Sequence, residues 1–94
     1  MTSKQRAYLR RLANKIDAIF QIGKNGINDN LIKQLDDALE AREIIKITIL
    51  ETAGENTKEL CNEIASELDA EPVQAIGNKF TIYRRSKNNP KIEL

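Results

Sequence analysis

The sequence contains no histidine and no tryptophan, and Cys61 is its only cysteine among 94 residues. Without histidine, acid–base or zinc chemistry based on imidazole is excluded. A single cysteine cannot form an internal disulfide, so a reducing cytoplasm is the simplest compartment. Cys61 falls on the apolar side of a helical pattern, which favours a buried, inert thiol over a nucleophile. We therefore expect no enzymatic activity, no cofactor, no metal and no small-molecule substrate.

Aromatic residues and long apolar runs are also scarce. The aromatic residues are Tyr8, Phe20, Phe80 and Tyr83, and both phenylalanines lie in apolar strand patterns typical of a core. An exposed aromatic platform of the kind that stacks nucleic-acid bases is therefore not expected, and any nucleic acid that the protein bound would be contacted mainly through its backbone. No run of about 18 apolar residues is present, so no membrane span is predicted. The basic start of the chain lacks the apolar segment of a secretory signal.

Charge is present in both signs but is unevenly distributed. The net charge is +1 overall, but it is +5 over residues 1–25, −8 over 26–78 and +4 over 79–94. This asymmetry suggests one face for a polyanion and another that repels it, although ordinary surface scatter is the alternative. The cations that we expect to contribute are Lys4, Arg11 and Lys15, together at one edge of the first helix, and Arg84 and Arg85 after the last strand.

Hydrophobic periodicity predicts three helices and four short strands. Thr2 or Ser3 and Asn28 are suitable N-caps, and Gly77-Asn78 is a hairpin signal. The predicted helices cover residues 3–16, 28–42 and 57–68, and the predicted strands cover residues 18–22, 44–50, 72–76 and 80–83.

The order of these elements predicts the fold class. Two helical crossovers imply parallel pairing, and the last hairpin is antiparallel. We therefore predict a two-layer α/β sandwich with a mixed four-stranded sheet. One domain is expected over residues 1–87, followed by a polar tail, 88–94; the chain from Arg84 onward is expected to fray.

A glycine-flanked loop is the main candidate site. Gly23 and Gly26 bracket Lys24 and Asn25 between a strand end and a helix start. Glycine lets another backbone approach closely, and a helix N-terminus attracts anions. The loop therefore suits a phosphodiester backbone, as the GxxG loop of KH modules does. A plain strand-to-helix turn is the alternative. A nucleotide P-loop is excluded because no Gly-Lys-Ser/Thr ending follows.

Acidic residues suggest a second interpretation. Asp36, Asp37 and Glu40 could hold a metal, and an acidic stripe at i, i+4 spacing along the third helix is formed by Glu55, Glu59, Glu63 and Glu67. A solvated face is the simplest explanation of both groups. The stripe could instead dock a basic protein, so an interaction adaptor that binds RNA incidentally remains the alternative function. An enzyme acting on a small anion or nucleotide is a third class, which turnover of any nucleotide would support.

Four segments together resemble the CRM domain, and more specifically its stand-alone bacterial YhbY-like members. They are KQRAYLRRLA, IGKNGI, REIIK and VQAIGNKFTIYR, and the resemblance extends from Lys4 to about Lys87. It implies an α-β-α-β-α-β-β fold similar to the C-terminal domain of bacterial translation initiation factor three.

The same resemblance implies a function. Stand-alone members associate with precursors of the large ribosomal subunit, and plant relatives assist group II intron splicing. RNA, expected to be ribosomal, would be the partner, and it would contact the GxxG loop and the neighbouring basic surface. By the motif match, Gly23, Lys24, Asn25 and Gly26 take the loop role, with support from the basic residues of the first helix.

Overall fold

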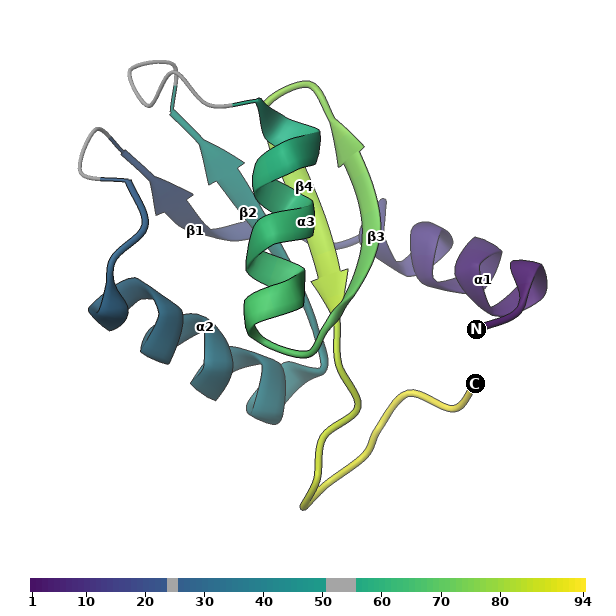
Figure 1. Ribbon diagram of the computed structural model, residues 1–94. Helices are drawn as coiled ribbons and strands as arrows, with labels where there is room; N and C mark the ends of the chain where they lie inside the picture. The colour runs from purple at the N-terminus through teal and green to yellow at the C-terminus, as the bar shows by residue number, and fades with distance from the viewer. Residues whose placement is uncertain (24–25, 51–55) are drawn as a thin grey trace.

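Seven helices and strands make up the computed structural model, which describes residues 1–23, 26–50 and 56–94 (Figure 1). Their order confirms the predicted α-β-α-β-α-β-β succession. The elements are α1 (Ser3–Ala13), β1 (Ala18–Ile22), α2 (Asp29–Arg42), β2 (Ile44–Ile49), α3 (Thr57–Glu67), β3 (Glu71–Ile76) and β4 (Lys79–Tyr83).

The four strands form one mixed sheet in the order β1-β2-β4-β3. β1 pairs with β2 in parallel, whereas β4 pairs antiparallel with both β2 and β3. The expected mixed sheet is thus confirmed. Because of these directions, the C-terminal end of β1 and the N-terminal end of β4 lie at one end of the sheet. The start of β1 and the C-terminal end of β4 lie at the other.

Each helix begins at a residue whose side chain accepts a backbone hydrogen bond. Thr2 accepts from the N–H of Gln5 at 3.1 Å, and the Gln5 side chain accepts from the N–H of Thr2 at 2.9 Å. Asn28 and Asn56 cap α2 and α3 in the same way. Each such cap stabilises its helix by about 1 kcal/mol.

The end of α1 differs from the prediction. The helix ends at Ala13 rather than near residue 16. The N–H of Lys15 donates to the carbonyl of Leu12 at 3.0 Å, which tightens the chain into a turn before β1. Lys15 therefore lies beyond the helix, and its predicted place with Lys4 and Arg11 along one helix edge is wrong.

Helices cover both faces of the sheet. Alternate residues of β2 point to opposite sides: Ile45 belongs to a large core with α2 and α3, and Ile44 to a smaller core with α1. In Figure 1, α2 and α3 accordingly lie apart from α1. The smaller core is formed by Leu9, Ala13, Ile44 and Tyr83, with Leu12, Ile16, Val73 and Ile92 packed against them.

The chain beyond β4 is held against α2 by a buried carboxylate. Glu43, fully buried directly after α2, accepts hydrogen bonds from three backbone N–H groups. They belong to Ser86 at 2.9 Å, Lys91 at 2.6 Å and Ile92 at 2.7 Å. The side chain of Ile92 also packs on the smaller core.

A second carboxylate, one helical turn earlier, acts on the same segment. Glu40 accepts from the N–H groups of Lys87 at 2.9 Å and Asn88 at 3.1 Å, and from the hydroxyl of Ser86 at 2.5 Å. We call Glu40 and Glu43 the carboxylate clamp. The expectation that this tail frays is wrong, because the clamp satisfies its backbone over residues 86–92. A domain boundary at residue 87 stays a prediction.

Across the part of the chain that the structure describes, no helix has the length and apolar character needed to cross a lipid bilayer.

Candidate nucleic-acid interface

Every charged residue of α1 is basic. The helix contributes a charge of +4 with no acid, and its cations are solvent-exposed. The guanidinium of Arg11 lies over the ring of Tyr8, 5.7 Å from its centroid, so a cation–π contact helps to orient that arginine. The basic residues of α1 are Lys4, Arg6, Arg10 and Arg11.

Acidic residues dominate the helices on the opposite face of the sheet. The net charge of α2 is −2, and that of α3 is also −2. Within α2, Lys33 and Asp37 form an exposed ion pair at 3.5 Å. The helices therefore separate cations from acids, as the charge distribution along the sequence suggested, whereas Arg84 and Lys87 of the tail lie among the acids of α2 and α3. Such a molecule would orient itself in the field of a polyanion, with α1 toward it and α3 away.

The glycine loop begins where β1 ends. The N–H of Gly26 donates to the carbonyl of Gly23 at 2.9 Å. Gly26 has a φ of +65°, in the left-handed region, and a Cβ there would meet no atom within 4 Å. Glycine is therefore required by the backbone angle rather than by crowding. Lys24 and Asn25, the predicted phosphate-contacting pair, lie outside the described residues.

A polar concavity of about 250 Å³ adjoins the loop. Sequence reasoning missed most of its lining, which consists of amide side chains next to the two glycines. Amides donate and accept hydrogen bonds and can contact phosphates, riboses or base edges. The high frequency of Asn and Gln around the loop could have indicated this lining. These residues were overlooked because they carry no charge. The amide residues are Gln21, Asn28, Asn30 and Gln34.

The N-terminus of α2 faces the same region. The side-chain oxygen of Asn28 accepts from the N–H of Leu31 at 2.8 Å, which satisfies one of the free donors of the first turn. The remaining donors and the helix dipole favour an anion. Asp29 in the first turn opposes this attraction, so Lys24 is needed to make the loop clearly cationic.

The other predicted contacts lie at the far end of the sheet. Lys15 precedes the start of β1, and Arg84 and Arg85 follow the end of β4, so none of them adjoins the glycine loop. Lys15 and Arg85 are exposed. The structure thus brings the end of α1, Lys15 and the basic tail to one end of the sheet, and places the glycines at the other.

Arg84 is occupied within the protein. Its guanidinium bonds to the carboxylate of Asp36 at 2.6 Å and to the carbonyl of Leu68 at 3.0 Å, and its side chain is only 17% exposed. The contact joins β4 to α2 and α3. A role for Arg84 in RNA binding stays a prediction, whereas Arg85 presents a free surface.

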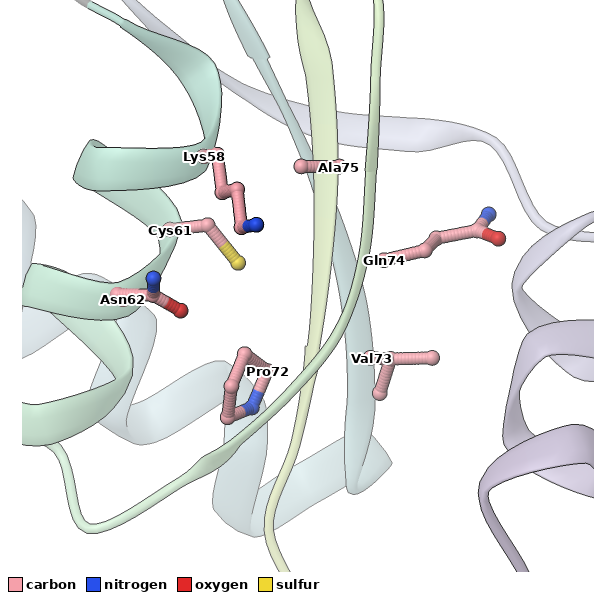
Figure 2. A pocket seen from close by; sticks show the side chains of 7 residues that line it. All are labelled: Lys58, Cys61, Asn62, Pro72, Val73, Gln74 and Ala75. Atoms are coloured by element: carbon pink, nitrogen blue, oxygen red, sulfur yellow. The ribbon is translucent and has the colours of Figure 1, made fainter. Parts of the chain in front are cut away.

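Figure 2 shows a cavity of about 350 Å³ between α3 and β3, where the sulfur of Cys61 points toward the sheet and the amide of Gln74 points away from α3. The thiol is 2% exposed and lies 4.0 Å from the carbonyl of Thr81. Burial raises the pKa of Cys61 to about 11, so the thiol stays protonated at neutral pH and is a weak nucleophile. The amide of Gln74 donates to Asn14 at 3.2 Å, linking β3 to the end of α1.

Comparison with known proteins identifies the family to which the chain is similar. The model of the CRS1 / YhbY (CRM) domain matches residues 1–84. The chain is 43% identical over 94 residues to the "Probable RNA-binding protein YqeI" of Bacillus subtilis, covering all of this chain and 98% of the relative. It is 30% identical over 94 residues to an "RNA-binding protein" of Haemophilus influenzae, covering 94% of it. The solution structure of the hypothetical protein SAV1595 from Staphylococcus aureus superposes with a TM-score of 0.78, at 49% identity over 100% of this chain and 98% of that one.

Proposed function

Because the chain belongs to the CRS1/YhbY (CRM) domain family, we propose that it binds structured RNA through the phosphate backbone. We further propose that this RNA is ribosomal RNA in precursors of the large subunit, as the resemblance to stand-alone members implies. The named relatives are described by RNA binding rather than by a reaction, which supports a binding protein over an enzyme.

The observation that carries the proposal is the separation of charge across the sheet. α1, with four cations and no acid, packs on one face, while the two acidic helices occupy the other. Phosphate contacts made by lysine and arginine supply sequence-independent affinity for nucleic acids. Within the described residues of the sheet, no aromatic side chain is exposed, since Phe80 and Tyr83 are buried and Phe20 packs against the core. Backbone contact is therefore favoured over base stacking.

Within this proposal the glycine loop has the most specific role. Gly23 and Gly26 would allow a phosphate to approach the backbone closely, and the N-terminus of α2 would present its free N–H groups. Lys24 would pair with the phosphate and Asn25 would add a polar contact. Lys4, Arg11 and Lys15 would add positive charge on the α1 side of the molecule, away from the loop.

Charge reversal in the loop tests the proposal. In the double variant Lys24→Asp/Asn25→Asp the glycines are kept, so the fold should survive while two carboxylates face the expected phosphate. We expect affinity for structured RNA, measured by filter binding or anisotropy, to fall at least about tenfold, which corresponds to about 1.4 kcal/mol. A well-folded variant that binds within about twofold of the parent would remove the loop from the mechanism.

The identity of the RNA needs a second experiment. Crosslinking the protein to RNA in growing cells and sequencing the attached fragments should recover precursor RNA of the large subunit. Fragments dominated by messenger RNA or by the small subunit would contradict that part of the proposal and leave RNA binding intact.

The acidic helices favour one alternative, an adaptor that docks a basic protein. Three of their acids already have internal partners, because Asp36 pairs with Arg84, Asp37 pairs with Lys33 and Glu40 holds the tail. The exposed stripe Glu59, Glu63 and Glu67 remains available. Purified protein that fails to bind bare RNA would favour the adaptor over direct RNA binding.

A further inference from the structure

Three cations from separate parts of the chain line one cavity at the end of β1 that is distant from the glycine loop. Lys15 precedes β1, Arg42 ends α2, and Lys46 lies on the face of β2 that α1 covers only in part. The cavity has a volume of about 390 Å³, within the usual range for ligand sites of about 300–1,000 Å³.

The charges of this cavity are not neutralised by ion pairs. Over residues 1–23, 26–50 and 56–94, neither salt bridge involves Lys15, Arg42 or Lys46. Among the residues that the structure describes, Asp17 is the one carboxylate in the lining. The C-terminal ends of α1 and α2 lie close by and carry partial negative charge. Three full positive charges exceed these opposing contributions, so the cavity favours an anion.

The floor of the cavity is apolar and partly exposed. Ile16, Ile19 and Ile44 contribute to it, and Ile19 is 42% exposed. Cations beside an apolar surface match a nucleotide unit, whose phosphate is anionic and whose sugar and base offer apolar faces. A bare inorganic anion would leave that apolar surface uncovered.

The edge strand β1 connects this cavity to the glycine loop. Ile19 lines the cationic cavity and Gln21 lines the polar concavity beside the loop. Both residues are exposed and lie about 7 Å apart along the strand, and a register irregularity between Ala18 and Phe20 interrupts the regular alternation of β1 at Ile19. The whole strand spans about 13 Å between its first and last residues, a length that a few nucleotides can follow.

We propose that the cavity formed by Lys15, Arg42 and Lys46 is a second phosphate site, and that one RNA strand runs along β1 from the glycine loop into it. This inference rests on the proposed function and extends it by giving the RNA a path. It assigns Arg42 and Lys46 to RNA binding, and it assigns Asp17 as the group that limits affinity.

The test compares two pairs of lysine substitutions with the same change in net charge. Lys15→Gln/Lys46→Gln removes charge from the cavity, and Lys33→Gln/Lys58→Gln removes it from the acidic helices. We expect the cavity variant to bind structured RNA at least about threefold more weakly. The slope of log K against log salt should become shallower by about 1, as for one lost phosphate contact. The control pair should match the parent in both quantities. Equal behaviour of the two pairs would overturn the proposal.

A substitution that is expected to raise RNA affinity provides an independent test. Asp17→Asn removes a carboxylate from the cavity and should raise RNA affinity at least about twofold. If Lys46→Gln impairs folding, as judged by thermal melting, Lys15→Gln alone and Asp17→Asn decide the question, since neither residue lies in a helix or strand. Unchanged affinity in both would refute the second site.

Two further comparisons show whether the second site alone or the whole proposed function is wrong. Inorganic phosphate and adenosine monophosphate, titrated by NMR, should perturb the amides of Ile19 and Ile44 only at concentrations far above those of RNA. Binding of either as tightly as RNA would replace the RNA path by a small-anion site. If the parent binds no RNA, the proposed function and this inference fall together. If Lys24→Asp/Asn25→Asp weakens binding while the cavity variants do not, only this inference falls.

Discussion

At the scale of single residues, Glu43 shows how the hydrogen bonds of a side chain can compensate for an unfavourable backbone angle. Its φ is +69°, a region in which glycine is usual after a helix and other residues cost about 1–2 kcal/mol. The N–H of Glu43 still completes α2 by donating to Leu39 at 2.8 Å, and its carbonyl accepts from Arg84 at 2.8 Å. A glycine would fit this backbone but would leave the N–H groups that the carboxylate now satisfies without a partner.

Cys61 illustrates the opposite case, a chemically notable residue with a packing role. Cys61→Ala should leave RNA affinity unchanged and lower the free energy of unfolding by about 1–2 kcal/mol, because it removes a small buried group. Urea unfolding and RNA binding of the same preparation measure both effects. A folded Cys61→Ala protein that no longer binds RNA would show that the α3–β3 cavity takes part in binding.

At the scale of elements, the sequence predicts what is local and misses what is distant. The bounds of β1 and α2 follow from alternation, an apolar stripe and the Asn28 cap, all within a few residues. The end of α1 was misplaced because apolar periodicity continues through Ile16, although the chain turns at Asn14 to enter β1. Docking of segment 86–92 was not predicted because Glu43 and Ile92 are 49 positions apart. No local sequence pattern predicts a contact over that separation.

The candidate site divides in the same way. A contiguous motif marked the glycine loop, whereas the cavity of Lys15, Arg42 and Lys46 is assembled from three separate segments. Its members look like ordinary surface cations in the sequence. Only the parallel pairing of β1 with β2 brings them together, so their relation could not be inferred before the strand order was known.

The carboxylate clamp should make stability depend on pH. Hydrogen bonds from the backbone N–H of Lys87, then the Ser86 hydroxyl, lower the pKa of Glu40 from 4.5 to about 2. Burial would raise the pKa of Glu43, but the N–H groups of Ser86, Ile92 and Lys91 outweigh it, and the pKa is lowered. Both groups therefore stabilise the fold above their unfolded pKa of about 4.5 and lose this contribution as the pH falls through the folded values.

This pH dependence can be measured against a variant. Glu43→Gln should lower the free energy of unfolding at pH 7 by about 2–3 kcal/mol, because an amide places N–H donors against the tail N–H groups. Its melting temperature should also change less than that of the parent between pH 5 and about pH 2. Glu93→Gln, at an exposed position of the same tail, is the control. Parallel melting curves for parent and Glu43→Gln over this range would contradict the clamp.

At the scale of the whole molecule, the arrangement of charge matters more than its sum. A net charge of +1 would predict little attraction to RNA, but the basic and acidic helices lie on opposite faces of a sheet. An approaching RNA would meet mostly cations on the α1 side. Encounter would therefore be oriented, and the acidic side would stay toward solvent or toward a protein neighbour.

RNA affinity should consequently fall steeply with salt while varying little among unrelated structured RNAs. The logarithm of the association constant should decline by about 0.7–0.9 per phosphate contact for each unit of log salt. Titrations on several RNAs of similar size between 50 and 200 mM salt would measure this slope, with a single-base change in each RNA as the control. A flat response to salt, or affinity abolished by a single-base change, would contradict binding through the phosphate backbone.

The carboxylate clamp also bears on the order in which the molecule assembles. Its hydrogen bonds join residues 43 to 49 positions apart, so each must close a long loop, and contacts of high sequence separation form slowly. The segment 86–92 can dock only after α2 has formed and β4 has brought the chain past it. In the folded protein, segment 86–92 can detach from α2 while the sheet stays intact. The amide protons of Ser86 and Ile92 should then exchange with solvent through a local opening of lower free energy than those of β2 and β4.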